Sequence, residues 1–375
     1  MLYFTIFFLL FIAGFLDLSD IPSIFRNVVF WLFIFVLIVL GAIRWRTGTD
    51  WFSYLIFFTR SNTYTEFTSG AFEYGYGLIA YISKSISTDY SLFLAIFAFL
   101  TISIKGYALK QSRYGEYFLI SLLIFYCYYI GDIFPIRQSL ALSITLFSGK
   151  YILEKKLVPF LICVFIATLI HNSSIVFLIA YPIAFVNLKT STAFFVLISS
   201  AIIGYVLVSL NSFEWLTKIP GLTGDAQDKL EVYSQIAAQG GDTTGGSNVD
   251  PKVSFITGLI RKIVVLVPLV YFRKQLAEKY EHFNVFFNLI VFGAVFYFIL
   301  GSLVQVLKRG ASYFDFFEVL VIPMFIFLGE TKWQRIIIYI IVAFYGLAKL
   351  YMVLNYYWDL FIPFYTIFHD SIPRY

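Results

Sequence analysis

Long apolar stretches separated by short polar breaks divide this chain of 375 residues from end to end. Each stretch is about 15–22 residues long, a length at which an apolar helix can cross a bilayer. Strands of a membrane barrel would instead alternate apolar and polar residues, and no such alternation is visible. We expect membrane spans at 2–16, 28–43, 90–104, 117–130, 136–153, 157–170, 173–188, 192–210, 258–272, 283–304, 312–328 and 336–354.

The composition also indicates an integral membrane protein. Hydrophobic residues make up 60% of the chain and charged residues 13%. A soluble domain carries about 25% charged residues, so the chain falls far outside that class. We therefore expect an all-α, polytopic membrane protein with about twelve transmembrane helices.

We expect one transmembrane domain, 1–375, with two extracytoplasmic loops. The first loop covers 44–89, and within it 72–86 is expected to form a re-entrant or interfacial helix. The second loop, 211–257, is long and flexible because it contains the glycine-rich run 240–247, and we interpret it as a lid over a long substrate. The glycine run is weak evidence for phosphate binding, since no strand precedes it and no lysine follows in P-loop fashion.

Lysines and arginines in short loops predict the orientation, because cytoplasmic loops are enriched in both. Clusters at 105–113, 150–156, 189, 273–279 and 332–335 all fall on one side, which we assign to the cytoplasm. With twelve spans, both termini then lie outside.

The opposite face still receives many cations, several of them at the ends of spans. Snorkelling would explain any one of these residues but explains the whole set poorly. We interpret the set as a basic, membrane-level site on the extracytoplasmic face. Its members are Arg44, Arg46, Arg60, Lys84, Arg137, Lys218, Lys229, Lys252, Arg261, Lys262, Lys308 and Arg309.

The first candidate site follows the apolar stretch 28–43. Arg44 and Arg46 can bind phosphate or carboxylate through paired hydrogen bonds and stay charged at physiological pH. Asp50 either pairs with one of these arginines or supplies a catalytic carboxylate. Tyr54 lies four residues further on, so it would share the face of Asp50 in a helix.

A second carboxylate follows in the aromatic run 73–77, where Glu73 and Tyr74 are adjacent. A mixture of carboxylate and tyrosine suits the faces and hydroxyls of sugars. Tyrosines also gather at membrane interfaces, so both interpretations stay open.

The second candidate site lies at the start of a span. Pro135 suits the first position of a helix, which puts Arg137 and Gln138 in the first helical turn. Free N–H groups and the positive end of the helix dipole are also there, so several attractive groups converge on one anion. We expect a diphosphate site; the alternative is a salt bridge between Asp132 and Arg137 that seals the helix end.

Two further polar turns belong to the same face. His171 lies between two spans and is either structural or a proton acceptor and phosphate ligand, because it shares its level with Arg137. Arg309 ends another span, and Tyr313 lies one turn beyond it.

Several motifs of other enzyme classes are missing. There is no cysteine–histidine cluster with zinc spacing, no nucleophile elbow, no Walker motif and no dinucleotide fingerprint. The first external loop lacks the adjacent acidic pair of metal-dependent polyprenyl-phosphate glycosyltransferases. We expect metal-independent chemistry without a cofactor, and the net charge of +5 is too mild to indicate nucleic-acid binding.

Taken in order, the motifs resemble the EpsG family of bacterial polysaccharide polymerases, the Wzy-type group. The resemblance covers nearly the whole chain, although the long external loop shows no family pattern. It is carried by Arg44, Gly48, Asp50 and Tyr54, by Glu73–Tyr74, by Ile136–Ala141 with Tyr151 and Lys155–Lys156, by Ile170–Ser174, by Arg309 with Tyr313, and by Pro363–Tyr365.

The resemblance implies a glycosyltransferase of the bacterial inner (plasma) membrane, with a helical bundle like that of the GT-C class. Such polymerases join undecaprenyl-diphosphate-linked oligosaccharide repeat units at the extracytoplasmic face. The growing glycan leaves its undecaprenyl diphosphate and passes to a hydroxyl of a new lipid-linked unit. The product would be O-antigen of lipopolysaccharide, capsule or exopolysaccharide, and the expected partners are membrane lipid and a flippase and chain-length regulator of the same pathway.

The expected roles follow from this reaction. The catalytic candidates are His171, Asp50 and Glu73; the diphosphate-binding candidates are Arg44, Arg46, Arg137, Gln138 and Arg309; the glycan-binding candidates are Tyr54, Tyr74 and Tyr313.

Two other functions stay open. One is a polyprenyl-linked-sugar glycosyltransferase or O-antigen ligase, and the other is a lipid-linked oligosaccharide flippase or transporter. A flippase should carry charge deep in a central cavity and show related halves. Here the charges cluster at one membrane face and no halves match.

Deleting the gene separates polymerase from flippase. Loss of a polymerase should leave a glycan of one repeat outside the cell, whereas loss of a flippase should trap the repeats inside. Labelling intact cells with a membrane-impermeant sugar reagent measures the difference. Repeats protected from the reagent would rule out the polymerase.

Overall fold

The computed structural model describes residues 1–48, 50–70, 72–111, 116–128, 130–134, 137–210, 251–300, 305–356 and 358–369. These residues form helices and connecting turns, with one isolated bridge and no strand among them, so the all-α class is confirmed. The helices are α1 (Leu2–Gly14), η1 (Phe15–Leu18), α2 (Ser23–Ile43), α3 (Trp51–Arg60), α4 (Tyr64–Thr68), α5 (Tyr74–Ile86), α6 (Tyr90–Leu109), α7 (Phe118–Tyr128), η3 (Ile130–Asp132), α8 (Arg137–Leu153), α9 (Leu157–Ile170), η4 (Asn172–Ile179), α10 (Ala180–Ala184), α11 (Thr190–Ser209), α14 (Pro251–Tyr271), α15 (Arg273–Lys279), α16 (Phe283–Ile299), α17 (Gln305–Asp315), α18 (Glu318–Val321), η5 (Ile322–Leu328), α19 (Lys332–Tyr356) and α20 (Trp358–Phe361).

Six helical segments in the described part of the chain are long and apolar enough to cross a membrane. They are Ser23–Ile43, Tyr90–Leu109, Thr190–Ser209, Lys252–Tyr271, Leu307–Leu328 and Lys332–Tyr356. Shorter apolar helices occupy Leu2–Leu18, Phe118–Tyr128, Leu157–Ile170, Asn172–Ala184 and Phe283–Ile299. Each of these eleven segments coincides with an expected span, so the prediction of a multi-helix membrane protein is confirmed, although five of them are shorter than a full span. The twelfth expected span, 136–153, is the more polar helix α8.

The chain divides into two compact units. The first unit combines Met1–Ile175 with Glu318–Tyr375, and the second is Val176–Phe317. Each unit has its own core, and the two are described separately.

In the first unit, α2 and α6 pack against each other in opposite directions. A Cβ at Gly41 would lie 3.0 Å from the Cβ of Ala98, and a Cβ at Gly106 would lie 2.8 Å from Cδ1 of Ile34. The two glycines therefore let the helices approach closely. Because Gly41 is near the end of α2, the part of α6 before Ala98 extends beyond that end.

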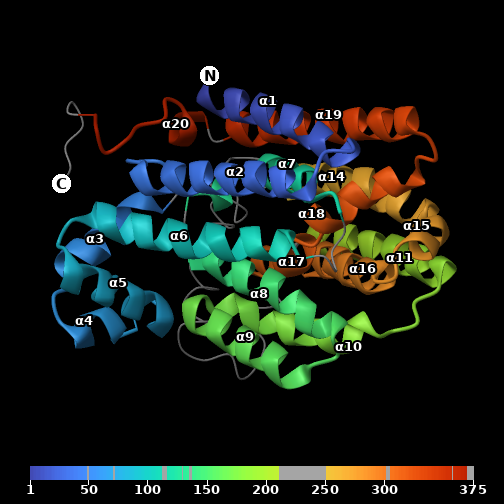
Figure 1. Ribbon diagram of the computed structural model, residues 1–375. Coiled ribbons are helices and arrows are strands. Elements are labelled where there is room, and N and C mark those ends of the chain that lie inside the picture. The colour runs from blue at the N-terminus through green and yellow to red at the C-terminus, as the bar shows by residue number, and fades with distance from the viewer. Residues whose placement is uncertain are drawn as a thin grey trace. The chain divides into compact units, whose positions relative to one another are not determined.

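Helices α3, α4 and α5 gather around this extension of α6 (Figure 1). The ring of Trp51 lies 5.2 Å from that of Tyr90, and the ring of Phe58 lies 5.5 Å from that of Phe93. Aromatic packing thus fixes α3 to the start of α6.

Lys105 departs from the expected topology. The sequence predicted a span ending at 104 and a loop lysine, but α6 continues to Leu109 and the Lys105 side chain is 0% exposed. Its Nζ lies 3.1 Å from Oγ of Ser139 on α8 and 5.3 Å from the ring centre of Phe125 on α7. Hydrogen bonding and ring contacts allow the cation to be buried, which periodicity alone does not reveal.

Lys262 in the second unit also departs from its expected position. Helix α14 begins at Pro251 rather than at 258, so Lys262 lies in the middle of the helix rather than at its start. There its Nζ forms an ion pair of 2.5 Å with Oδ1 of Asp315 on α17. Of the expected flexible loop, 211–250 lies outside the described residues.

Lys84 caps the C-terminal end of helix α3. The sequence analysis placed this residue among the cations of the predicted extracytoplasmic site. Its Nζ donates to the carbonyl oxygens of Phe58, Thr59 and Ser61 at 2.7, 2.9 and 2.6 Å. These carbonyls lie at the end of α3, where helical partners run out. An ammonium group has three N–H donors, so this arrangement occupies all of them.

Replacing Lys84 by Met should loosen α3 from α5, because it leaves these carbonyls without their donor. We expect a loss of about 2 kcal/mol in the free energy of unfolding. Thermal unfolding can be followed in detergent by the exposure of the buried Cys127 thiol, in a Cys163→Ser background. The matched control is Lys156→Met, which removes a 60% exposed lysine from a surface ion pair and should change little. Equal unfolding temperatures for the two variants would contradict the capping role.

Candidate functional site

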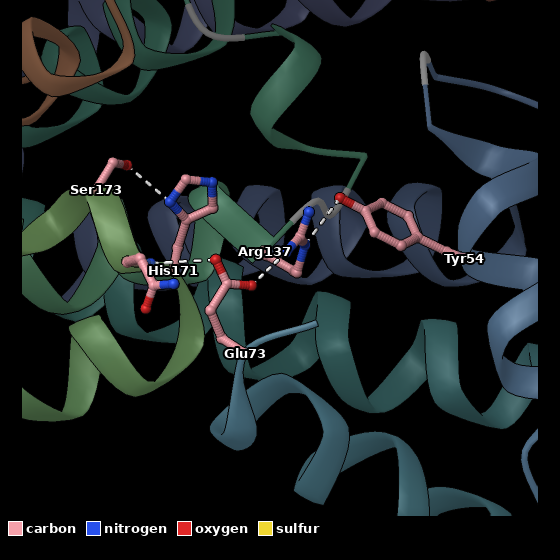
Figure 2. A network of polar contacts seen from close by, with 6 residues as sticks. Tyr54, Glu73, Arg137, His171 and Ser173 are labelled. Atoms are coloured by element: carbon pink, nitrogen blue, oxygen red, sulfur yellow. Dashed lines mark hydrogen bonds and ion pairs between the residues drawn. The ribbon is translucent and has the colours of Figure 1, made fainter. Parts of the chain in front are cut away.

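An ion pair between Glu73 and Arg137 lies at the centre of the polar network in the first unit (Figure 2). Glu73 precedes α5 as its N-cap residue but makes no capping hydrogen bond to that helix. Its Oε2 instead accepts from Nη1 of Arg137, the first described residue of α8. Its Oε1 accepts from the backbone N–H of Asn172 at 3.2 Å. One carboxylate thus joins the starts of α5 and α8 to the turn after α9.

Two glycines allow Glu73 to reach these partners. A Cβ at Gly75 would lie 2.8 Å from the carbonyl oxygen of Leu169, near the end of α9. A Cβ at Gly77 would overlap the carbonyl oxygen of Phe67 on α4. The sequence run 73–77 is therefore a close-packing motif as well as an aromatic one, a feature that the sequence analysis missed.

Aromatic rings surround the guanidinium of Arg137. Its Cζ lies 4.3 Å from the ring centre of Phe72 and 5.7 and 5.8 Å from those of Tyr54 and Tyr76. Its Nε donates to Oη of Tyr54 at 3.4 Å. A planar guanidinium suits such stacking, and the side chain keeps 20% of its surface exposed. Phe72 and Tyr76 are site residues that the sequence analysis did not single out.

His171 lies beside the ion pair. It ends α9, is 7% exposed, and its Nδ1 lies 2.7 Å from Oγ of Ser173. Figure 2 shows Glu73 between Arg137 and the His171 turn. When the serine hydroxyl donates to Nδ1, the ring proton is on Nε2; the other tautomer reverses both roles.

The surroundings keep Glu73 ionised. Burial alone raises the pKa of its carboxyl, but Arg137, the Asn172 N–H and His171 together outweigh burial and lower that pKa below its ordinary value. A carboxylate with a lowered pKa is a weak base. Glu73 is therefore better suited to orient Arg137 than to take up a proton.

Arg44 is buried beneath its own turn. Its side chain is 2% exposed, its Nη1 donates to the carbonyl oxygen of Thr47 at 2.9 Å, and its Cζ lies 5.3 and 5.9 Å from the ring centres of Trp51 and Phe134. At Gly48, φ is +106°, and a Cβ would approach Nη1 of Arg44 to 3.2 Å. The Arg-x-x-x-Gly spacing therefore describes a turn closed over its arginine.

The C-terminal tail pairs with the same turn. The N–H of Trp45 donates to the carbonyl of Tyr365 at 2.9 Å, and the N–H of Ile367 donates to that of Ile43 at 2.8 Å. The fold thus brings together two sequence motifs from opposite ends of the chain.

The neighbouring candidates differ in exposure. Arg46 is exposed, with its Cζ 5.6 Å from the ring centre of Phe52. Asp50 is partly exposed and precedes α3 without capping it through its side chain. Tyr54 is buried and lies one turn from Trp51, so Arg44 and Arg137 contact α3 at adjacent turns.

The other candidates belong to both units. Gln138 is partly exposed in the first turn of α8, and Tyr74 is 45% exposed. Arg309 and Tyr313 belong to α17 of the second unit, where Arg309 is partly exposed and Tyr313 is buried. Pro135 and the Asp132 side chain, on which the alternative salt bridge depends, lie outside the described residues.

A model of the EpsG family matches residues 27–366. The chain belongs to the EpsG family. This family comprises Wzy-type, exopolysaccharide-polymerase-like proteins. No curated protein and no solved structure matches the chain.

Every contact of the Glu73–Arg137 network falls within the part of the chain that matches the EpsG family. Across the described ranges, no three His, Cys, Asp or Glu side chains are grouped so that they could hold a metal ion. The groups that the EpsG-family site offers are a guanidinium, an imidazole and a carboxylate that holds the guanidinium in place.

Replacing Glu73 by Gln tests the ion pair through pH. Because the pKa of Glu73 is lowered on folding, its stabilisation is fully present above the unfolded value of about 4.3 and is lost as pH falls through the lowered value. We expect Glu73→Gln to lose about 2–4 kcal/mol of unfolding free energy at about pH 8, and the difference from wild type to vanish only as pH falls below about 4.

The measurement is thermal unfolding across this pH range. The double variant Glu73→Gln/Arg137→Gln is the control, because a large coupling between the two changes isolates the pair itself. A Glu73→Gln protein as stable as wild type at about pH 8 would contradict an ionised Glu73 paired with Arg137.

Proposed function

We propose that this EpsG-family protein polymerises undecaprenyl-diphosphate-linked oligosaccharide repeat units at the extracytoplasmic face of the bacterial inner membrane. The proposal includes a GT-C-like bundle of about twelve transmembrane helices and metal-independent chemistry. The observation that carries it is the placement of Arg137, held by Glu73, beside His171. A cation and a candidate base at the end of apolar helices suit a lipid-linked anionic substrate.

The proposed reaction is a glycosyl transfer. A hydroxyl oxygen of the new lipid-linked unit attacks the anomeric carbon of the growing chain. The bond from that carbon to the diphosphate oxygen breaks, and its electron pair leaves with undecaprenyl diphosphate. The hydroxyl proton passes to the base, so no oxidant, reductant or nucleotide is consumed.

Arg137 is the proposed ligand of the leaving diphosphate. Its described hydrogen bonds use Nη1 and Nε, and among the described residues no acceptor takes the Nη2 hydrogens. That edge is free to meet the charge that develops on the leaving oxygen. One preorganised donor of this kind is worth about 3–4 kcal/mol of barrier.

His171 is the proposed base. Glu73 is held ionised by Arg137 and the Asn172 N–H, so it serves as the positioning residue, while Asp50 stays the alternative base. The hydroxyl of Ser173 orients the imidazole, as a third group orients the base in many transfer enzymes.

The remaining candidates take supporting roles. Arg46 is exposed and can reach a lipid diphosphate, whereas the buried Arg44 holds the turn that presents it. Gln138, next to Arg137 in the first turn of α8, is proposed as a further diphosphate ligand, and Arg309 of the second unit stays a prediction from the sequence. We further propose a flippase and a chain-length regulator as pathway partners.

Arg137→Ala tests this function in a deletion strain that carries the variant gene. We expect polymer to disappear and single capped repeats to remain, because a loss of about 10²–10³ in rate should prevent extension. Arg137→Lys should give an amount of polymer between those of wild type and Arg137→Ala, since an ammonium cannot replace the planar guanidinium. Silver-stained glycan ladders at matched expression give the readout.

The matched control is Lys332→Ala, which removes an exposed cation at the start of α19, outside the predicted basic site, and should leave the ladder unchanged. A normal ladder from an expressed Arg137→Ala protein would remove Arg137 from the site.

A further inference from the structure

Two exposed tyrosines are joined at the surface of the first unit. Tyr64 on α4 and Tyr74 at the start of α5 are 43% and 45% exposed, and their hydroxyl oxygens lie 2.8 Å apart. The ring of Tyr64 also meets that of Tyr81 edge to face, with centres 5.5 Å apart. Two wide aromatic faces are thus held in a fixed arrangement while they remain open to solvent.

Apart from Arg60, which is exposed at the end of α3, the surface around Tyr64 is polar, with little free charge. Exposed neutral side chains precede and follow it at Asn62, Thr65 and Ser69. The nearby carboxylate of Glu66 is used within the backbone, since its Oε2 accepts from the N–H groups of Asn62 and Thr63 at 2.6 and 3.3 Å. The patch therefore offers rings, hydroxyls and amides rather than charge.

This patch is continuous with the proposed catalytic site. Tyr74 directly follows Glu73, whose carboxylate holds Arg137. Gly77 seats α5 against α4, so the ring of Tyr64 and the carboxylate of Glu73 belong to one packed group. A glycan whose diphosphate lies at Arg137 can therefore extend across these rings.

The residues of the patch suit a neutral sugar better than an anionic lipid headgroup. Headgroups of anionic lipids are recognised by clusters of lysine and arginine. Here Lys84 is occupied with the carbonyls of α3, and the exposed Arg60 is a single cation rather than a cluster. A neutral sugar instead presents C–H faces that pack on aromatic rings and hydroxyls that pair with threonine, serine and tyrosine. Tyrosine supplies such contacts at a low cost in side-chain entropy.

We propose that Tyr64 and Tyr74 form a platform that binds a neutral sugar of the glycan chain. The inference rests on the proposed function and deepens it, because it assigns a subsite for the oligosaccharide rather than for the diphosphate. A chain held on the platform between successive transfers stays at the enzyme longer and grows further. The platform sets polymer length without taking part in bond breaking.

The first test compares polymer length. We expect Tyr64→Ala/Tyr74→Ala to keep joining repeats but to shorten the modal chain, because the loss of two aromatic anchors weakens sugar binding by about ten-fold or more. Tyr64→Phe/Tyr74→Phe keeps the rings and should give an intermediate length. Tyr351→Ala, which removes a 57% exposed tyrosine from α19 of the same unit, should leave the ladder unchanged. A wild-type ladder from the double alanine protein would overturn the platform.

The second test measures binding directly, and its first arm uses the wild-type protein alone. The full-length protein in nanodiscs is mixed with water-soluble oligosaccharide released by mild acid from the host's own lipid-linked repeats. We expect saturation-transfer NMR signals on the sugar protons with wild type and a large loss with the double alanine protein. No transfer with wild type would overturn the proposal outright.

The two tests separate this inference from the proposed function. If the polymerase assignment fails, Arg137→Ala gives a normal ladder whatever the tyrosine variants do. If the platform alone fails, Arg137→Ala abolishes polymer while the tyrosine variants behave as wild type.

Discussion

The first unit depends on a charged pair that ties together segments far apart in the sequence. Glu73 contacts Arg137 through one carboxylate oxygen and the Asn172 N–H through the other. Removing ions from water costs several kcal/mol each, so either partner alone would be unfavourable at this depth. The pair therefore fixes the starts of α5 and α8 and the end of α9 relative to one another.

Close contacts with the backbone position the helices that carry this pair. Gly75 and Gly77 let α5 approach α9 and α4, and Lys84 closes the end of α3 against α5. Tyr54 on α3 then meets Arg137. Three short helices, none of which is long enough to be stable alone, become a rigid support for one guanidinium.

The sequence predicted the parts of this structure that depend on local pattern. Apolar stretches located the helices, and the motif around Arg137 contains a residue that the fold places at the centre of a polar network, while its part in binding stays a prediction. The sequence suggested a loop for Lys105 and the start of a span for Lys262, whereas Lys105 is buried and Lys262 half-buried, each with a partner on another helix. No local pattern reveals such partners.

The same limit applies to Glu73. The sequence presented it as a free carboxylate among aromatics, because its partner lies 64 positions away. Likewise, Arg44 and Arg46 looked equivalent, although one is enclosed by its turn and the other faces outward. The turn depends on Gly48 and on pairing with the C-terminal tail, which only the fold brings together.

The pairing also bears on turnover in the proposed reaction. An arginine without a counter-ion at headgroup depth would hold undecaprenyl diphosphate tightly both before and after transfer, and such uniform binding does not speed the chemical step. Glu73 competes for the same guanidinium, so it weakens binding of the ground state and of the product. The edge that carries Nη2 can still strengthen its contact as charge develops on the leaving oxygen. A partly neutralised arginine is therefore better suited than a bare one to an enzyme that must release its lipid carrier after each addition.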